Sequence, residues 1–298
     1  MDRLQSMQVF VRVAEAQSFA AAARALTLSP AAVTRAVAAL EARVDARLFT
    51  RSTRAVKLTD AGARYLEDCR RILADIDEAE SAAAGIYARP GGTLTVTASV
   101  LFGQMYVQPI LTDFLDLHPA VVGRTLFVDR LTSLIDEGVD VAVRIGHLAD
   151  SGLAATRVGT VRRVICASPD YLARRGAPAT PAELASHRLA AATSAWAELE
   201  WRFGGDRPTT VPVTPSLFCN TYQGAIDAAR AGWGLTRALS YQIAPALRRG
   251  DLATVLDAFE EPPLPVHVVH AQGRRPSAKV RAFVDLAVAR LRATPLSG

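Results

Sequence analysis

The chain contains 298 residues, of which 50% are hydrophobic, and it carries a formal net charge of +5. This length supports more than one hydrophobic core, and no run of about 18 apolar residues occurs, so we expect no membrane-spanning helix. The N-terminal stretch "MDRLQSMQVF" lacks the basic flank, apolar core and cleavage site of a secretory signal, so we expect a cytoplasmic protein with no membrane partner.

The three cysteines lie far apart, at Cys69, Cys166 and Cys219, and none belongs to a CxxC pair. This spacing predicts neither a zinc site nor a disulfide framework, and we expect buried thiols. The sequence also lacks a G-x-S-x-G motif, a P-loop and an H-E-x-x-H motif. We therefore predict no enzyme, no catalytic residues, no cofactor and no metal.

The positive charge is concentrated at the start of the chain. Residues 1–64 contain ten basic and five acidic residues, whereas the remainder contains 24 of each. A local excess of cations indicates a polyanionic partner for this segment. A chance imbalance of surface charge is the alternative.

Helix signals follow one another closely in the first segment. Apolar residues at helical spacing predict a helix over residues 3–16. Ser18 is a good N-cap for a second helix over residues 19–26, because its hydroxyl accepts from the free N–H groups of a first helical turn. Ser29, followed by proline, starts a third helix that runs to about residue 44.

A short helix, a tight connection and a longer helix predict a helix-turn-helix. The N-terminal turn of the longer helix then projects, and its hydroxyl, guanidinium and methyl groups suit base edges and phosphates. The predicted DNA contacts on this helix are Ser29, Pro30, Ala31, Ala32, Thr34 and Arg35. A helical packing module with a solvated basic edge is the alternative.

The next stretch, "RLFTRSTRAVKLTDAG", predicts a small β-wing. Its cations and hydroxyls suit contacts with the DNA backbone. The predicted contacts are Arg51, Thr53, Arg54 and Lys57.

The stretch "FVRVAEAQSFAAAARALTLSPAAVTRAVAALEARVDARLFTRSTRAVKLTDAG" resembles the N-terminal winged helix-turn-helix of LysR-type transcriptional regulators. The shared motifs are the serine that starts the recognition helix, a later hydroxyl–arginine pair, "LF.R" and "LT.AG". Here they are Ser29–Pro30–Ala31, Thr34–Arg35, Leu48–Phe49–Arg51 and Leu58–Thr59–Ala61–Gly62. The resemblance implies sequence-specific binding to double-stranded operator DNA.

Some positions depart from the family pattern. Gln17 stands where the family has a glycine before the capping serine, and the glycine before "LF" is replaced around Asp45. No glutamine occurs early in the recognition helix. These departures leave the predicted fold unchanged and leave open which operator bases are read.

A long helix with a narrow apolar seam is predicted over residues 60–88, with Thr59 as its N-cap. The seam consists of Tyr65, Cys69, Ile72, Ile76, Ala79, Ala83 and Ile86. Such a stripe favours pairing with a second copy in a two-fold dimer, which the family resemblance also implies. Packing against the chain's own second half is the alternative. The following "ARPGG" is predicted to be a hinge.

From residue 93 the pattern alternates between strands and helices, which predicts a mostly parallel sheet with helices on its faces. After a strand at "TLTVTAS" we expect a helix over 103–117, a strand over 124–128, a helix over 131–137 and a strand over 139–145. Further strands are expected near residues 161–167, 188–192, 199–203, 216–219, 234–237 and 264–270. Further helices are expected at residues 169–175, 181–186, 222–232, 241–248 and 277–292.

The stretches "LIDEGVDVAVRIG" and "NTYQGAIDAARAGWGL" are similar to the effector-binding domain of the same family. The resemblance implies an α/β fold with an N-terminal winged helix-turn-helix, a long linker helix and a two-lobed, periplasmic-binding-protein-like α/β effector domain. The implied domains are residues 1–60, 61–90 and 91–298. One lobe would comprise residues 91–162 and 267–298, and the other residues 163–266.

Candidate effector contacts lie at strand ends, because ligands of open α/β folds bind beyond the carboxyl ends of the strands. Two such ends run into helix starts, whose free N–H groups attract anions and polar groups. The predicted contacts are Ser99, Phe102, Arg144, His147, Asn220 and Thr221, with Thr193 and Arg237 as second-rank candidates. The plainer explanations are helix capping for Ser99 and Asn220, an inter-lobe ion pair for Arg144 and a solvated loop for His147.

These observations predict a LysR-type regulator that binds operator DNA and a small, anionic effector held between its lobes. The predicted partners are DNA, the effector and further copies of the chain, as a homodimer or a dimer of dimers, with RNA polymerase as a further candidate. Two other interpretations stay open. One is an enzyme or solute-binding protein with a fused DNA-binding head, and the other is a constitutive DNA binder without an effector.

Overall fold

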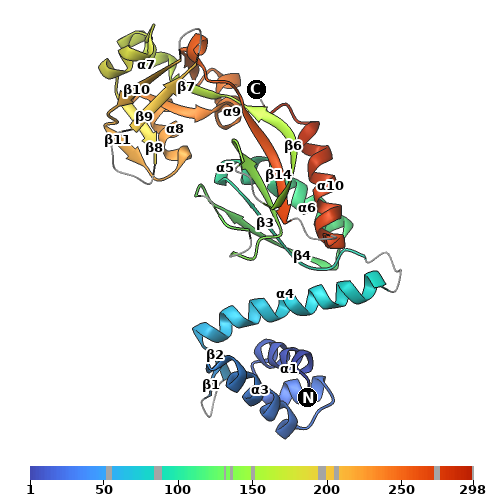
Figure 1. The fold of residues 1–298 in the computed structure, drawn as a ribbon. Coiled ribbons are helices and arrows are strands. Elements are labelled where there is room, and N and C mark those ends of the chain that lie inside the picture. Colours follow the sequence, from blue (N-terminus) through green and yellow to red (C-terminus); the bar gives the residue numbers. More distant parts are fainter. Residues whose placement is uncertain are drawn as a thin grey trace. The chain divides into compact units, whose positions relative to one another are not determined.

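The computed structural model describes residues 1–51, 56–83, 89–130, 132–134, 137–148, 152–193, 199–204, 208–271 and 276–296. They form two compact units, Met1–Arg89 and Pro90–Gly298 (Figure 1). The first unit is mainly helical, and the second is built on two five-stranded sheets.

The first unit begins with three helices, α1 to α3, whose starts are set by polar caps. Their bounds are Arg3–Ala16, Phe19–Ala25 and Pro30–Val44. The hydroxyls of Ser18 and Ser29 each accept from the backbone N–H three residues later at 3.2 Å. These N–H groups have no partner within the helix, so the two serines define the predicted stop and restart of the chain.

The three helices share one apolar core with the elements that follow. Its buried members are Met7, Val9, Phe10, Val13, Ala22, Ala23, Val33, Ala36, Val37, Leu40, Leu48, Phe49, Leu66 and Cys69. Ala22 and Ala23 are at most 1% exposed, so the small side chains of α2 allow close packing in this core.

A hairpin and a long helix complete the first unit. Strand β1 (Phe49–Arg51) pairs antiparallel with β2 (Val56–Leu58), which confirms the predicted wing. Helix α4 (Asp60–Ala83) begins after Thr59, whose hydroxyl accepts from the N–H of Gly62 at 2.9 Å.

Gly62 lies where α4 meets the hairpin. A Cβ at this position would lie 2.0 Å from the carbonyl oxygen of Leu48, a backbone atom that no side-chain rotation can move. The N–H of Thr59 donates to the same carbonyl at 3.0 Å. The glycine of the "LT.AG" motif is therefore explained by close contact between the start of α4 and the start of the wing.

The first sheet of the second unit has the strand order β4-β3-β5-β14-β6. In chain order its strands are β3 (Gly92–Ala98), β4 (Val121–Phe127), β5 (Val141–Ile145), β6 (Leu153–Val161) and β14 (Leu264–Ala271). Helices α6 (Gln108–Leu117) and α10 (Ala278–Arg292) lie along one face and share an apolar core with it (Figure 1).

The second sheet has the strand order β11-β8-β12-β7-β13. Its strands are β7 (Arg163–Ala167), β8 (Leu189–Ala192), β11 (Leu217–Cys219), β12 (Leu235–Leu239) and β13 (Ala253–Val255). A separate antiparallel ribbon is formed by β9 (Leu199–Phe203) and β10 (Thr209–Val213). The helices of this part are α7 (Pro169–Arg175), α8 (Tyr222–Arg230) and α9 (Ser240–Arg249).

Both five-stranded sheets are mixed, which corrects the expectation of a mostly parallel sheet. In the first sheet β14 runs antiparallel to β5 and β6, and in the second β7 runs antiparallel to β12 and β13. The reason is topological. The chain passes between the sheets twice, from β6 to β7 and from β13 to β14, and the strands that receive it run against their neighbours.

Two predicted helices also differ from the structure. The described residues within 131–137 form no helix, and Leu134 among them is buried in a small core with Val139. The helix expected over 103–117 is divided into α5 (Val100–Phe102), a π-turn (Gly103–Val107) and α6. Strands β6, β10 and β13 were not anticipated as separate elements.

No helix among the described residues is long and apolar enough to cross a membrane. All three cysteines are free thiols. Burial raises the pKa of Cys69 to about 11 and that of Cys166 to about 12, so both thiols stay protonated at neutral pH.

Candidate functional site

The first turn of α3 presents small and polar side chains to solvent. Those that are exposed or half-exposed are Ser29, Pro30, Ala31, Ala32, Thr34 and Arg35. The opposite face of the helix is buried through Val33, Val37 and Leu40, which are at most 1% exposed. Since the apolar face fixes how α3 lies on its core, the polar face remains free to meet a partner.

The wing is anchored by a buried carboxylate that the sequence did not reveal. Glu41 of α3 is 7% exposed, and its Oε1 accepts from the N–H groups of Leu48 at 2.8 Å and Phe49 at 3.2 Å. These hydrogen bonds tie the start of β1 to α3. On β2 the side chain of Lys57 is exposed, as a backbone contact requires.

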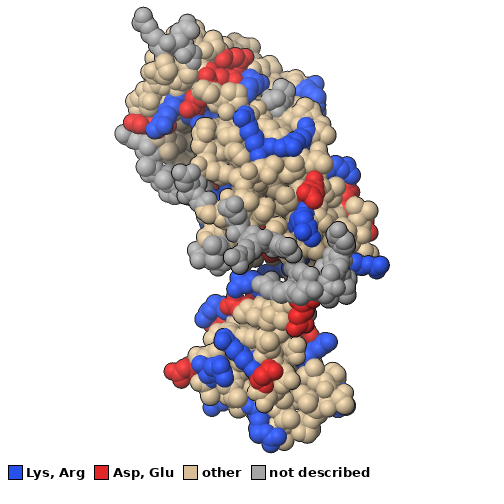
Figure 2. Space-filling view, turned by 45° about the vertical axis from the view of Figure 1, so that its right-hand side comes forward, with Lys and Arg blue, Asp and Glu red and all other residues tan. Residues whose placement is uncertain are grey.

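Other predicted wing residues cannot be placed. Thr53 and Arg54 lie outside the described residues, and of Arg51 only the backbone, in β1, is described. Figure 2 shows basic side chains spread over the visible face of the first unit, with acidic ones between them. On this face the cations are thus interspersed with acidic side chains rather than gathered into one patch.

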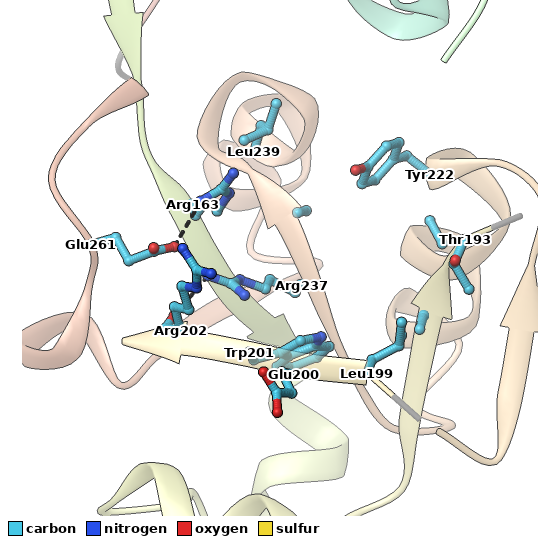
Figure 3. A pocket seen from close by; sticks show the side chains of 13 residues that line it. Arg163, Thr193, Leu199, Glu200, Trp201, Arg202, Tyr222, Arg237, Leu239 and Glu261 are labelled. Carbon is cyan, nitrogen blue, oxygen red and sulfur yellow. Dashed lines mark hydrogen bonds and ion pairs between the residues drawn. The ribbon is translucent and has the colours of Figure 1, made fainter. Parts of the chain in front are cut away.

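The second unit contains a cavity of about 380 Å³ beside the second sheet. Its lining residues are Arg163, Ala191, Ala192, Thr193, Leu199, Glu200, Trp201, Arg202, Tyr222, Arg237, Ala238, Leu239 and Glu261. Figure 3 shows the arginines and Glu261 on one side, with Thr193 and Tyr222 on the other. The cavity therefore has a charged end and a hydroxyl-bearing end.

The charged end is held by one carboxylate oxygen. Oε2 of Glu261 accepts from Nη1 of Arg163 at 2.8 Å and from Nη2 of Arg237 at 2.6 Å. Arg237 Nη2 also donates to the carbonyl of Arg202 at 2.8 Å, and its guanidinium carbon lies 5.6 Å from the ring centre of Trp201. Burial lowers the pKa of Arg237, which the charge of Glu261 partly offsets.

The hydroxyl-bearing end is close to the loop after β4. The pKa of Tyr222 is raised, first by burial and then by the negative charge of Asp129, while Arg163 and Arg237 act in the opposite sense. The phenol thus stays protonated and can donate a hydrogen bond into the cavity.

Comparison with known proteins matches both units. Residues 4–63 match the bacterial regulatory helix-turn-helix protein of the lysR family, and residues 88–292 match the LysR substrate binding domain. The chain belongs to the LysR family of transcriptional regulators. It is accordingly a DNA-binding transcriptional regulator with an effector-binding domain, and members of this family are not enzymes.

Its relatives span nearly the full length of this LysR-type regulator. A helix-turn-helix-type transcriptional regulator of Xanthomonas campestris pv. campestris is 36% identical over 293 residues, 97% of this chain and 85% of that protein. A transcriptional repressor of Pseudomonas aeruginosa is 34% identical over 292 residues, 96% of this chain and 91% of that protein. The solved structure of CrgA, a LysR-type regulator from Neisseria meningitidis, has a TM-score of 0.62 and 27% identity, and the match covers 96% of this chain and 98% of that one.

The structure brings together only the two second-rank candidates for effector contact, because Thr193 and Arg237 both line the cavity. Thr221 is the N-cap of α8 and accepts from the N–H of Gly224 at 3.2 Å, while Asn220 is exposed beside it. Capping at this helix therefore falls to Thr221, one residue after the predicted Asn220.

The candidates near the first sheet have other surroundings. Phe102 is 1% exposed and packs against Tyr106 and Tyr241 at 4.9 and 5.1 Å between ring centres, so it offers no wall to a ligand. The hydroxyl of Ser99 lies 3.4 Å from that of Tyr241. The N–H of Val100 donates to Asp129 at 3.0 Å, so an internal carboxylate already occupies the start of α5 and disfavours an anion there.

Arg144 and His147 do not join the cavity either. Among the residues that the structure describes, Arg144 donates to the backbone carbonyl of Thr132 rather than to a carboxylate. His147 is exposed. His267, opposite Arg144 on β14, has a buried Nδ1 without a hydrogen-bond partner among the described residues.

The predicted seam of α4 begins inside the first unit. Cys69 is fully buried in its core, and Tyr65 and Ile72 pack against that core, so packing within their own unit accounts for them. Ile76 is half-buried and is not among the described residues that pack against this core. The side chains of Ala79 and Ala83 are not described, and Ile86 lies outside the described residues.

Sequence reasoning missed most of the cavity. Arg163 and Glu261 each lie beside a point where the chain passes between the sheets, which no local pattern marks. Trp201 and Arg202 alternate on β9 as in any strand. Tyr222 carried a usable signal, since it directly follows the predicted Thr221 at the start of α8.

Proposed function

We propose that this LysR-type regulator binds its operator as a dimer, through the first turn of α3 and the wing, and that a small anionic effector in the cavity alters this binding. The observation that carries the effector proposal is the convergence of Arg163 and Arg237 on a single carboxylate oxygen of Glu261. Two cations sharing one anion leave the charged end able to accept a further negative group.

The DNA-binding part of the proposal rests on exposed groups of α3 and β2. Arg35 suits base edges or phosphates, and Lys57 suits a phosphate. DNA from immediately upstream of the gene serves as the operator probe in gel shifts. Arg35→Ala is expected to weaken operator binding about tenfold or more, and Lys57→Ala to weaken all DNA binding and lower the salt slope by about one.

Arg43→Ala is the matched control, because Arg43 is an exposed cation in the last turn of the same helix. The proposal fails if Arg43→Ala and Arg35→Ala weaken binding equally, or if residues 90–298 alone shift the probe as well as the full chain does.

The effector part is tested by thermal unfolding with carboxylic acids and their neutral amides. Acids are expected to stabilise the wild type more than the amides do, and Arg237→Gln should remove the difference. Arg144→Ala distinguishes the earlier candidate site near the first sheet. If that substitution removes the preference and Arg237→Gln does not, the effector binds there. A protein stabilised by no acid, with constant operator affinity, would be a constitutive DNA binder.

Dimerisation is proposed through the half of α4 that continues beyond Ile72, where the half-buried Ile76 is not among the described residues that pack against the core of the first unit. A two-fold pair would present two α3 helices to two half-sites of the operator.

A further inference from the structure

Two segments carry the chain between the two sheets, and ion pairs tie them together. One runs through Arg162 into Arg163, the first residue of β7, and the other is residues 260–263, which lead into β14. Arg162 Nη1 donates to both carboxylate oxygens of Glu260 at 2.9 Å. Arg163 Nη1 donates to Glu261 Oε2 at 2.8 Å. Adjacent residues of one segment thus pair with adjacent residues of the other.

The two pairs differ in what else they touch. Glu261 lines the cavity and also binds Arg237, whereas Glu260 lies outside that lining in the part of the chain that the structure describes. The side chain of Glu261 is 18% exposed, like that of Arg237. Glu261 is therefore both a wall of the cavity and a link between the crossing segments.

The cavity's own charges leave room for one more anion. Among the lining residues that the structure describes, the cations Arg163, Arg202 and Arg237 outnumber the carboxylates Glu200 and Glu261 by one charge. A ligand carboxylate has the same shape and charge as the group that Glu261 already presents, so the donors that hold Glu261 also suit the ligand. If the ligand carboxylate replaced Glu261, the Glu261 side chain would move into solvent and the arginines would keep an anionic partner. No buried charge would then lack a counter-ion.

We propose that Glu261 is an internal competitor of the effector: a small carboxylate takes over Arg163 and Arg237, displaces Glu261, and so unties one of the two ion pairs between the crossing segments. The inference rests on the cavity being the effector site, as proposed above. The Arg162–Glu260 pair stays in place as a pivot. Because the ligand binds better to the untied arrangement than to the tied one, it shifts the equilibrium between sheet arrangements.

The test compares full-length wild type, Glu261→Gln, Glu260→Gln and Arg237→Gln. The probes are acetate with acetamide and benzoate with benzamide at matched ionic strength, and each protein is compared with its own ligand-free unfolding temperature. Glu261→Gln should bind the acids about tenfold more tightly than the wild type, because the competitor is gone. Glu260→Gln, the matched control, should stay within about twofold, and Arg237→Gln should lose the preference for acids.

Hydrogen exchange reports the released link. Peptides covering residues 161–164 and 259–265 should exchange faster in acid-bound wild type than in the ligand-free wild type. Ligand-free Glu261→Gln should already show the faster exchange, and adding acid should increase it no further.

The outcomes separate the two proposals. If acids bind the wild type through Arg237 but Glu261→Gln binds them no more tightly than Glu260→Gln, Glu261 is not a competitor and the effector cavity stands. If hydrogen exchange of these peptides in ligand-free Glu261→Gln equals that of the ligand-free wild type, Glu261 does not link the two crossing segments. If neither acid stabilises the wild type or Glu261→Gln, the cavity is not a carboxylate site and both proposals fall.

Discussion

Gln17 and Asp45 have left-handed backbones, with φ of 47° and 50°, at the C-terminal ends of α1 and α3. These are the positions where the sequence departs from the glycines typical of LysR-type regulators. A side chain in this conformation brings Cβ close to the following carbonyl, which costs about 1–2 kcal/mol, less for aspartate. Gln17 and Asp45 therefore adopt the turn that glycine would adopt, at some cost in stability.

Gln17→Gly should stabilise the first unit by about 0.5 kcal/mol, the relief of strain minus the added entropy of the unfolded chain. Gln8→Gly, at an exposed position inside α1, is the control and should destabilise the unit by about 1 kcal/mol. Hydrogen exchange of peptides from α1 and α2 measures both changes. Slower exchange in Gln8→Gly, or faster exchange in Gln17→Gly, would contradict the strain argument.

Glu41 is a second residue whose role is structural. Glu41→Ala leaves the buried N–H groups of Leu48 and Phe49 without their acceptor, which should cost on the order of 2 kcal/mol. Glu67→Ala removes an exposed carboxylate and should change stability by less than about 0.5 kcal/mol. Exchange of peptides covering α3 and β1 separates the two. Equal effects would mean that Glu41 does not anchor the wing.

At the scale of elements, α3 and α4 each divide their surface between two tasks. The buried face of α3 fixes the helix on the core, and the exposed side chains of its first turn are those proposed to contact DNA. Helix α4 begins in the core of the first unit, where Leu66 and Cys69 are buried. The early positions of the heptad pattern thus make an internal contact, and the later positions are those proposed for the dimer. A helix can change neighbours along its length without changing its period.

Ile76→Asp tests the proposed dimer without touching that core. If α4 pairs with a second copy, the substitution buries like charges at the two-fold axis and should weaken the dimer by several kcal/mol. Sedimentation equilibrium should then show a mass nearer one chain than two. Glu80→Lys, an exposed position on the same helix, is the control. An unchanged mass for Ile76→Asp rules out this part of α4 as the dimer contact.

At the scale of the whole molecule, two histidines make the second unit sensitive to acid. The pKa values of His187 and His267 are lowered, first by burial. Folding therefore disfavours their protonation, and the stability they lend is complete above the ordinary pKa of about 6.5. It is lost as pH falls below that value through the lower folded pKa values.

The unfolding temperature of the second unit should consequently fall between pH 7 and pH 5.5. The double variant His187→Gln, His267→Gln should decline less steeply over the same range, whatever its stability at pH 7. Thermal unfolding followed by tryptophan fluorescence reports this unit, since all three tryptophans belong to it. A double variant with the full wild-type slope would assign the pH dependence to other groups.

Local patterns in the sequence were enough to determine the first unit and the order of most elements in the second. Ser18, Ser29 and Thr59 cap helices by bonds to N–H groups only three residues away, and apolar spacing reports burial along one helix or strand. The family resemblance is carried by the same short-range features. The first turn of α3 could therefore be described residue by residue before any fold was known.

The cavity was decided only by the tertiary structure. Arg163 and Glu261 are almost one hundred positions apart, and they meet because the chain passes twice between the sheets at the same place. Phe102 and Arg144 have side chains that could contact a ligand. In the structure, however, Phe102 packs against Tyr241, and Arg144 donates a hydrogen bond to Thr132. The sequence shows which local interactions a side chain can make within its own turn or strand. Burial and charge pairing depend on neighbours in space, so the partner of each side chain was decided only when the distant strands came together in the sheets.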